Sequence, residues 1–318
     1  MASIWPKEEI FKQLINRSVR KLKRDRLNKS LKKANVGGIV KQLNFEDKTA
    51  RMYLPSEDIG LSRQLQFSSI REWRSTEYLI GLLKKKNYDH ILDLGANLGY
   101  FVIIESLFSE AKITAVEPVN FNYSILKLNM SLNNLEEVDL RNIAVGSSNT
   151  QVVIYEFGQK NWSTVDKDHA QHLESQGYEA SEQLVTQIRL DDLLGEFGEG
   201  YKTGLIRMDV EGFEYEILTP SKQLKENSYD LFVEFHSNIL GQFRSLSLLR
   251  SLKECGYKKS VVIFNEEFSK DEQIFAYKNN KRHQFMLLED LIKEFENTSD
   301  EFIEKNFGFE LFLSKGEL

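Results

Sequence analysis

Cysteine and proline are scarce in this sequence, and a long apolar run is missing. Cys255 is the only cysteine, so the chain cannot form an internal disulfide or a cysteine-rich zinc site. This composition suits a reducing compartment, and we expect a cytoplasmic protein. No run approaches the ~18 apolar residues of a membrane-spanning helix, and the first residues, MASIWPKEEIFKQL, lack the apolar core of a secretion signal. Four prolines argue against long extended linkers.

The chain is nevertheless rich enough in apolar residues to bury a large core. Hydrophobic residues make up 41% of its 318 residues and charged residues 28%, a balance that excludes global disorder. This length corresponds to one large domain, or to one domain with additions.

Positive charge is concentrated near the N-terminus. Residues 1–35 contain eleven Lys or Arg and three acids, so this segment carries +8 and the remainder −14, for a net charge of −6. An acidic body lacks the basic footprint that phosphates need, and we expect no DNA partner. The pattern over 7–34 predicts a helix that packs on the body or on a second subunit of a homo-oligomer. The alternative is a peripheral helix that touches anionic lipid or an acidic polymer.

Strands and helices alternate from about residue 90 onward. Short strands and turns are expected over 39–70, followed by a helix over 70–85. The runs that predict strands are HILDLG, KITAVEP, VDLRNIAVG, GLIRMDVEG, YDLFVEFH, SVVIFN and FELFLSK, and the first of them are separated by the helical runs YFVIIESLFS and NYSILKLNMSLNN. This alternation favours an α/β fold with a mostly parallel sheet and helices on both faces.

Residues 151–190 interrupt this alternation. QVVIYEF and LVTQIRLDDLL flank a polar stretch, which predicts a β-hairpin arm with a long loop between its strands. Loops of this length in a compact domain are usually functional or mobile.

Two glycines bracket a turn between the first predicted strand of this series and its helix, in Asp93-Leu94-Gly95-Ala96-Asn97-Leu98-Gly99. Gly95 and Gly99 let the backbone approach a ligand without a Cβ in the way, and Asn97 lies between them. The helix that follows directs its N-terminal amides at the same ligand. The spacing is G-x-x-x-G, whereas dinucleotide enzymes have G-x-G-x-x-G. Asp93 would repel a phosphate but can hold a cationic amino group, which favours S-adenosylmethionine over NAD.

Further cofactor contacts are expected where the next strands end. Glu117 ends the second strand, 24 residues after Asp93, and a carboxylate there can accept both ribose hydroxyls. Asn142 and Ala144 end the third strand, where a side-chain amide and a backbone N–H could meet adenine. Tyr100 begins the helix after the glycine turn, and it contacts either the cofactor or the packing between helix and sheet.

The motifs in this order resemble those of a known family. DLGANLGYF, AVEP, RNIAVG, TQIRLDDLL, IRMDVEGFEYEIL and LFVEFH follow one another as in the FkbM family of class I methyltransferases. The resemblance covers about residues 88–240 and implies a seven-stranded Rossmann-like sheet, S-adenosylmethionine as donor and an oxygen acceptor on a sugar, glycan or glycosylated metabolite. It does not reach the segment before about residue 60.

The resemblance also suggests a division of the chain. We expect a basic arm with lead-in strands over 1–60 and a methyltransferase domain over 61–318. Within that domain, the cofactor half covers about 88–150, the hairpin arm about 151–190 and the substrate-facing half about 200–318.

Four polar residues end the two strands that begin the second half. Asp209 and Glu211 end one strand, and Glu234 and His236 end the next, each pair with an i, i+2 spacing that points both side chains the same way. Methyl transfer to a hydroxyl requires removal of its proton, and we expect His236 or Asp209 to be the base. Glu211 and Glu234 would orient the acceptor's other hydroxyls, while Asp209 also borders the cofactor. The same four residues could hold Mg²⁺ or Mn²⁺, but no metal site is predicted.

Three other functions compete with sugar O-methylation. The first is methylation of a nitrogen, lipid or nucleic-acid acceptor, which the acidic body disfavours for nucleic acid. The second is a non-catalytic binding protein that retains the fold, which the intact Asp93, Gly95, Gly99 and Glu117 disfavour. The third is a NAD-dependent oxidoreductase, which the glycine spacing disfavours.

Overall fold

The structure is a computed structural model that describes most of the chain after residue 36. The described residues are 37–58, 60–157, 163–164, 170–171, 174–176, 180–197, 203–264, 283–306 and 308–316. The predicted helix over 7–34 and most of the loop expected within the hairpin arm lie outside the described residues.

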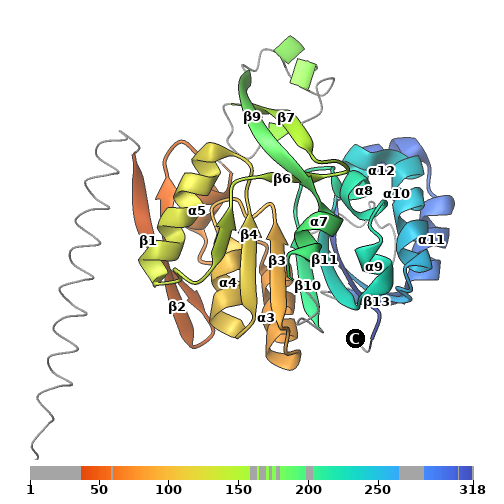
Figure 1. Ribbon diagram of the computed structural model, residues 1–318, viewed down its shortest axis with the longest axis horizontal. Helices are drawn as coiled ribbons and strands as arrows, with labels where there is room; N and C mark the ends of the chain where they lie inside the picture. Colours follow the sequence, from red (N-terminus) through yellow and green to blue (C-terminus); the bar gives the residue numbers. More distant parts are fainter. Residues whose placement is uncertain are drawn as a thin grey trace, which may run out of the picture.

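An eight-stranded sheet forms the centre of the molecule (Figure 1). Its strands, in spatial order, are β13 (His283–Leu287), β12 (Lys259–Ile263), β14 (Phe309–Ser314), β11 (Tyr229–Phe235), β10 (Gly204–Met208), β3 (His90–Leu94), β4 (Lys112–Val116) and β5 (Asp139–Arg141). The five strands from β11 to β5 are parallel, β14 is antiparallel to both of its neighbours, and β13 is antiparallel to β12. The α/β class and the mostly parallel sheet are therefore confirmed.

The number of strands differs from the expected seven. The additional strand is β13, which pairs with β12 at the edge of the sheet. Its HQFML run follows a polar stretch, and Phe285 and Leu287 remain about half exposed, so it lacks the buried apolar pattern that marks the other strands.

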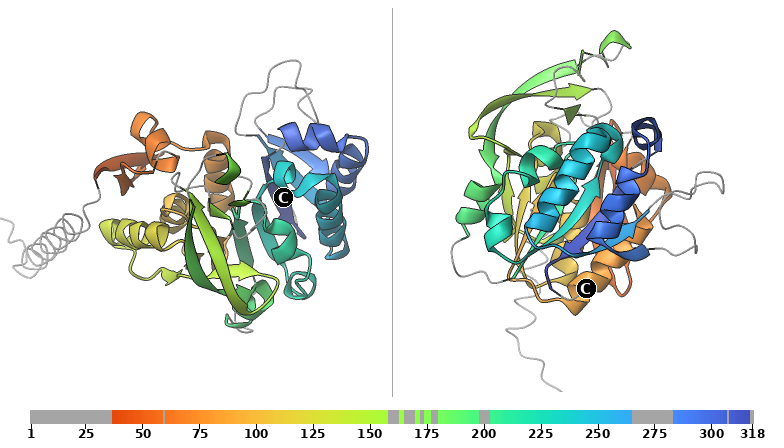
Figure 2. Two further views of the ribbon diagram at one scale, coloured as in Figure 1. Left: turned by 90° about the horizontal axis from the view of Figure 1, so that it is seen from above. Right: turned by 90° about the vertical axis from the view of Figure 1, so that its right-hand side faces the viewer.

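Both faces of the sheet are buried, which explains the continuous apolar runs in its strands. Ile91, Leu205 and Phe232 point into one core, whereas their neighbours Leu92 and Ile206 point into the other. Each core lies between one face of the sheet and the helices that cover this face (Figure 2).

The first core is covered by the helices of the first half of the chain. These are α2 (Leu61–Phe67), α3 (Trp73–Lys85), α4 (Tyr100–Phe108) and α5 (Asn120–Asn133). The second core is covered by α7 (Leu190–Gly195), α8 (Glu214–Leu218), α9 (Gln223–Glu226), α10 (Ser237–Glu254), α11 (Leu288–Glu296) and α12 (Asp300–Asn306). In the described part of the chain, no helix is both long and apolar enough to cross a membrane.

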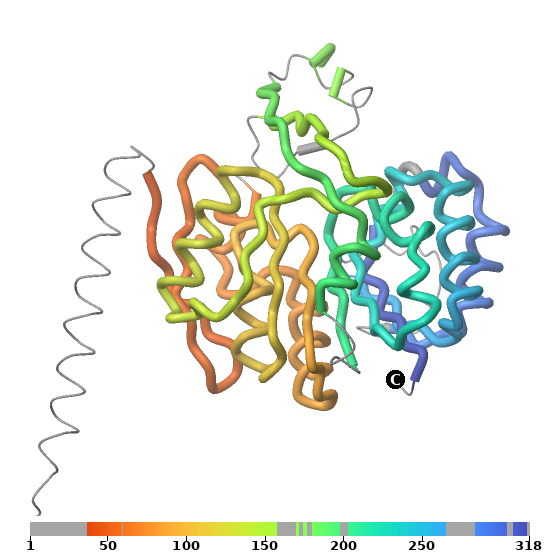
Figure 3. Tube along the Cα trace, in the orientation of Figure 1, coloured from red at the N-terminus to blue at the C-terminus, as the bar shows by residue number. Residues whose placement is uncertain are grey.

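The predicted hairpin arm is present as a separate sheet beside the central one. Its strands, in spatial order, are β6 (Ala144–Gly146), β9 (Ala180–Arg189), β7 (Thr150–Phe157) and β8 (Ser163–Thr164). In the trace of Figure 3, β7 and β9 rise together beyond the upper edge of the central sheet.

The run VDLRNIAVG forms two strands where one was expected. The first, β5, ends the central sheet, and the second, β6, leaves it to pair in parallel with β9. The break lies at Asn142, whose side-chain amide donates to the backbone carbonyls of Glu117 and Pro118, at 3.0 Å each. Beyond β5, the hydrogen bonds from the Asn142 side chain to the residues after β4 thus take the place of further strand pairing between β5 and β4.

The N-terminal region begins with a hairpin of β1 (Gly38–Phe45) and β2 (Lys48–Pro55). Helix α2 follows, in a stretch for which strands and turns were expected. Its seven residues are too few to display a helical period. Its last carbonyls are satisfied from outside the helix, because Lys41 Nζ donates to the oxygens of Leu65 and Gln66. The next helix, predicted over 70–85, begins at Trp73.

Asn129 on α5 joins the hairpin to the glycine turn. Its Oδ1 accepts the backbone N–H of Tyr53 at 2.7 Å, and its Nδ2 donates to the carbonyl of Leu98 at 2.8 Å. The side chain is fully buried, so these bonds have no water to replace them.

Substitution of this residue tests the junction. Asn129→Ala is expected to lower the free energy of unfolding by about 2–3 kcal/mol, because it leaves buried backbone groups without partners. Urea denaturation measures the loss. The matched control is Asn133→Ala, which removes similar bonds to the backbone of Arg51 at the surface and should cost less than about 1 kcal/mol. Equal losses in the two variants would contradict a special role for Asn129.

Candidate active site

The glycine turn lies where the strand order of the sheet reverses, between β3 and β10. Gly95 and Gly99 have φ angles of +82° and +90°, which residues with a Cβ rarely adopt. A Cβ on Gly95 would come within 1.8 Å of the backbone oxygen of Asp209, so the first glycine also permits close contact with the end of β10. The backbone amides of Gly95 and Ala96 both donate to the carbonyl of Val116, which ties the turn to the end of β4.

A pocket opens beside this turn, with an empty volume of about 840 Å³ that includes its mouth. It is bounded by the ends of β3, β4 and β10, by the segment around β6 and by the arm. The lining residues are Leu94, Gly95, Asn97, Val116, Glu117, Pro118, Asn122, Ile143, Ala144, Val145, Ile154, Gln187, Asp209, Val210, Glu211 and Phe213. Five of the predicted cofactor residues, Gly95, Asn97, Glu117, Ala144 and Asp209, thus meet in one cavity.

Glu117 is the buried acid of this pocket, with only 3% of its surface exposed. One carboxylate oxygen accepts the backbone N–H of Asn97 at 2.8 Å, and the other accepts that of Val119 at 2.9 Å. Burial raises the pKa of Glu117 to about 7, although these N–H donors act in the opposite direction. The carboxylate therefore titrates near neutral pH.

Four predicted cofactor residues do not line this pocket in the structure. Asp93 is fully buried and accepts a hydrogen bond from Arg207 at 3.1 Å. Gly99 lies against Leu126, and the Asn142 side chain holds the end of β4 as described above. Contact of these three residues with a cofactor stays a prediction.

The fourth, Tyr100, lines a smaller adjoining cavity that it shares with Arg71, Asn97, Arg207 and Asp209. Its hydroxyl contacts the hydroxyl of Thr76 at 3.2 Å and accepts the backbone N–H of Arg71 at 3.0 Å. Tyr100 is thus both a packing residue and a neighbour of the site.

Arg207 on β10 is a central residue of the site that the sequence reasoning missed. Its guanidinium contacts Asp93 at 3.1 Å and Asp209 at 3.5 Å, and it stacks on the ring of Phe101 at 3.9 Å. The available signal was a single charged residue inside the otherwise apolar run GLIRM, since a buried arginine requires partners.

Asp209 lies just beyond the end of β10 and borders both cavities. Burial favours its neutral form, but the positive charges of Arg207, His236 and Arg71 prevail and hold the pKa of Asp209 below its usual value. It is therefore ionised at neutral pH and can accept a hydrogen bond or a proton.

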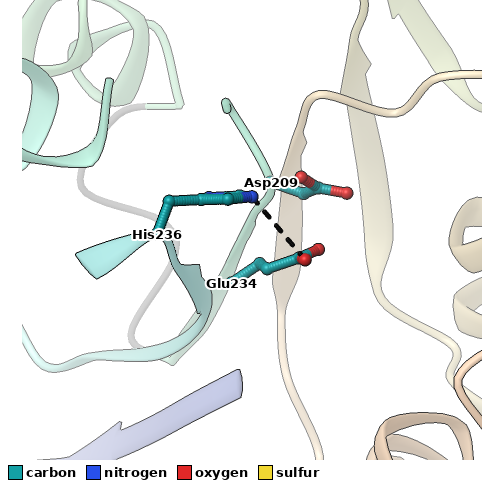
Figure 4. A group of neighbouring side chains, drawn as sticks. All are labelled: Asp209, Glu234 and His236. Atoms are coloured by element: carbon teal, nitrogen blue, oxygen red, sulfur yellow. Dashed lines mark ion pairs between the residues drawn. The ribbon is translucent and has the colours of Figure 1, made fainter. Parts of the chain in front are cut away.

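His236 lies among three carboxylates. Its Nδ1 is 2.7 Å from Glu214, and its Nε2 is 3.5 Å from Glu211 and 3.6 Å from Glu234. Figure 4 shows the imidazole, Glu234 and Asp209 turned toward one another. Burial alone would lower the pKa of His236, but the surrounding carboxylates raise it well above the usual value. An imidazolium donates two hydrogen bonds and cannot accept a proton.

The i, i+2 alignment expected for Asp209 and Glu211 does not form. Strand β10 ends at Met208, and Glu211 has a φ of +51° in the turn that follows. Glu211 still lies 3.5 Å from His236 Nε2, and Gly212, at φ +95°, continues the turn close to Ile239. Glu214, fully buried on α8, was also missed, although it belongs to the quoted run IRMDVEGFEYEIL.

Two groups of side chains could hold a metal ion in the described part of the chain. The ligand atoms of Asp209, Glu234 and His236 all lie within 4.8 Å of one another, and so do those of Glu72, Glu234 and Glu310. Glu234 is common to both groups.

The central sheet, with its reversed strand β14 and the glycine turn at the switch point, defines a Rossmann-like α/β protein of the class I methyltransferase type. Residues 93–259 match the family described as the methyltransferase FkbM domain. This match covers more than half of the chain, which therefore belongs to the FkbM family.

A curated relative carries the name Methyltransferase 1 and comes from Beauveria bassiana (strain ARSEF 2860). It is 26% identical over an aligned length of 155 residues, and the alignment covers 44% of this chain and 60% of that protein. The chain thus spans less than two thirds of that relative's length.

Solved structures of methyltransferases are more distant. P. horikoshii TYW2 in complex with MeSAdo is 10% identical with a TM-score of 0.40, over 87% of this chain and 72% of that one. An O-methyltransferase from a Brevibacillus brevis trans-AT PKS multienzyme, in complex with S-adenosyl-L-homocysteine, is 13% identical with a TM-score of 0.35, over 80% and 73%. Similarity at this level does not identify a function.

Substitution of the first glycine tests the construction of the turn. Gly95→Ala should lower the free energy of unfolding by about 2–4 kcal/mol, because the added methyl meets the Asp209 carbonyl and the φ is unfavourable. The control is Gly81→Ala, an open position in the middle of α3, which should raise stability by about 1 kcal/mol. Urea denaturation of both variants gives the comparison. An unchanged free energy of unfolding in Gly95→Ala would contradict the close approach of the two strand ends.

Proposed function

We propose that the protein is an S-adenosylmethionine-dependent methyltransferase that methylates a hydroxyl of a sugar, glycan or glycosylated metabolite. The observation that carries this proposal is the meeting of Gly95, Glu117 and Asp209 in one pocket beside a cluster of further carboxylates. Membership of the FkbM family supports the methyl transfer, and the carboxylate cluster supports a hydroxyl-rich acceptor.

The pocket has the groups that the donor requires. Gly95 leaves room that a Cβ would fill, Glu117 offers a carboxylate to ribose hydroxyls, and Ala144, Ile154 and Phe213 provide apolar walls for a purine. Asp93 is positioned beneath the turn with one carboxylate oxygen that lacks a hydrogen-bond partner among the described residues. When bound, S-adenosylmethionine supplies an electrophilic methyl group on a sulfonium.

Asp209 is the residue we assign as proton acceptor for the attacking hydroxyl. It borders both cavities and is ionised, whereas the two nitrogens of His236 face carboxylates. His236 is then held by its hydrogen bond to Glu214, and its positive charge lies beside Glu211 and Glu234. These two carboxylates bind neighbouring hydroxyls of the acceptor. Of the two bases considered from the sequence, Asp209 has the better geometry.

We propose that the protein acts in the cytoplasm, which is a reducing compartment. The single cysteine, Cys255, and the absence of any disulfide requirement support it.

The affinity for S-adenosylmethionine is expected to depend on Glu117 and on pH. The ionised carboxylate accepts hydroxyl donors best, so affinity should fall as the pH drops below the pKa of about 7 and should level off above it. The fall is at most about tenfold per pH unit, because one proton is involved. Titration calorimetry between pH 6 and 8, with and without chelator, measures it.

Glu117→Gln should weaken binding at pH 8 by about 10- to 100-fold and remove most of the pH dependence. The exposed Glu110→Gln is the matched control and should bind as the unaltered protein does. If Glu117→Gln keeps full affinity, the carboxylate does not hold the ribose.

The role of Asp209 is tested by the separation of turnover from donor binding. Asp209→Asn should lower kcat by about 100-fold or more while the Kd for S-adenosylmethionine changes less than about tenfold, because the amide cannot accept the proton. Release of S-adenosylhomocysteine in the presence of free sugars, glycosides and nucleotide sugars reports turnover. The control is Asp192→Asn on α7, a half-exposed acid that lies outside the pocket and pairs with Arg189. A loss confined to donor affinity would move Asp209 from the chemistry to the cofactor site.

A further inference from the structure

A second group of carboxylates adjoins the site described above. Glu72 precedes α3, Glu234 lies on β11 and Glu310 lies on β14, and one ligand atom of each is within 4.8 Å of the others. Glu234 also belongs to the group drawn in Figure 4, so the two groups are contiguous.

The reversed direction of β14 creates this arrangement. Glu310 is the second residue of that strand, and it is the register partner of Glu234 on β11. Directly opposed residues on antiparallel strands project on the same face at close distance, where two carboxylates repel each other. The strand therefore places a second acid against Glu234 at the edge where the parallel strands end.

The charges in this group are incompletely compensated within the described part of the chain. Glu310 is 1% exposed, and its Oε1 has no hydrogen-bond partner. Glu72 pairs with Arg71 through one oxygen, while its other oxygen is buried without a partner. A buried carboxylate oxygen without a partner is costly, and a bound cation would supply the partner that each of these atoms lacks.

The positive charges near this group are shared with other partners: Arg71 acts on Glu72, Asp209 and Glu234, and the charge of Arg207 reaches Glu310. Arg74 donates to the backbone oxygen of Phe264 at 2.6 Å, and Arg207 contacts Asp93 and Asp209. An additional cation would lie between oxygens contributed by three different elements.

We propose that Glu72, Glu234 and Glu310 bind a divalent cation of the Mg²⁺ or Mn²⁺ class. Carboxylate oxygens are the ligands that these hard cations prefer, and water or an acceptor oxygen completes the coordination. Binding requires ionised carboxylates and releases any proton that they share. The catalytic role rests on the proposed function: through Glu234 the cation lies next to Asp209, where it fixes an acceptor hydroxyl and lowers its pKa.

Binding of Mn²⁺ alone tests the site without any acceptor. The full chain is treated with chelator and dialysed, and Mn²⁺ is added while electron paramagnetic resonance measures the free aqueous ion. We expect one equivalent to bind per chain, in competition with Mg²⁺. Glu310→Gln and Glu234→Gln, both nearly isosteric, should each weaken binding by at least about tenfold. Glu137→Gln, at an exposed position before β5, is the control and should bind normally.

Two results would overturn the proposal. One is the absence of bound Mn²⁺ at millimolar concentration in a protein whose thermal unfolding is normal. The other is full binding by Glu310→Gln together with loss in His236→Gln, which would assign the ion to the group of Asp209, Glu234 and His236. Titration of the same metal-free protein with S-adenosylmethionine distinguishes failure of the metal site from failure of the proposed function. A protein that does not bind the donor would count against the proposed function and would leave the metal result unaffected.

Discussion

The buried ion pairs of Arg207 hold the two halves of the site together. Its guanidinium lies between Asp93, on the strand before the glycine turn, and Asp209, beyond the next strand of the sheet. Removal of the arginine would leave Asp93 buried without its counter-charge and would weaken the compensation of Asp209, which typically costs several kcal/mol. The glycine turn, the donor pocket and the proposed base thus share one cation, and the ring of Phe101 fixes the plane of that cation.

The parts of this fold that follow from local pattern could be predicted from the sequence. Strands buried on both faces are continuous apolar runs, and glycines at positive φ mark the turn, so β3, β4, β10 and the cavity residues Gly95 and Glu117 were anticipated. The parts that depend on distant partners were not. The role of Arg207 depends on its ion pairs with Asp93 and Asp209, which lie far from it or outside its strand. Strand β13 forms by pairing with β12 at the edge of the sheet.

The protonation of His236 also depends on distant partners that the sequence pattern does not reveal. A histidine at a strand end has a usual pKa near neutrality, which made His236 a reasonable candidate. The structure adds Glu214 from α8 and Glu211 from an unexpected turn, and together with Glu234 they favour the charged imidazolium. A residue type suggests a role, but the number of opposite charges around it decides its protonation.

The hairpin arm has a thermodynamic consequence for any ligand of the donor pocket. Ile154 on β7 and Gln187 on β9 form part of the pocket wall, although neither strand belongs to the central sheet. A ligand in the pocket therefore buries surface on the arm as well as on the sheet. By linkage, part of the binding free energy also stabilises the arm in the position it has in the structure, and a change that disturbs this position lowers the affinity for the ligand in return.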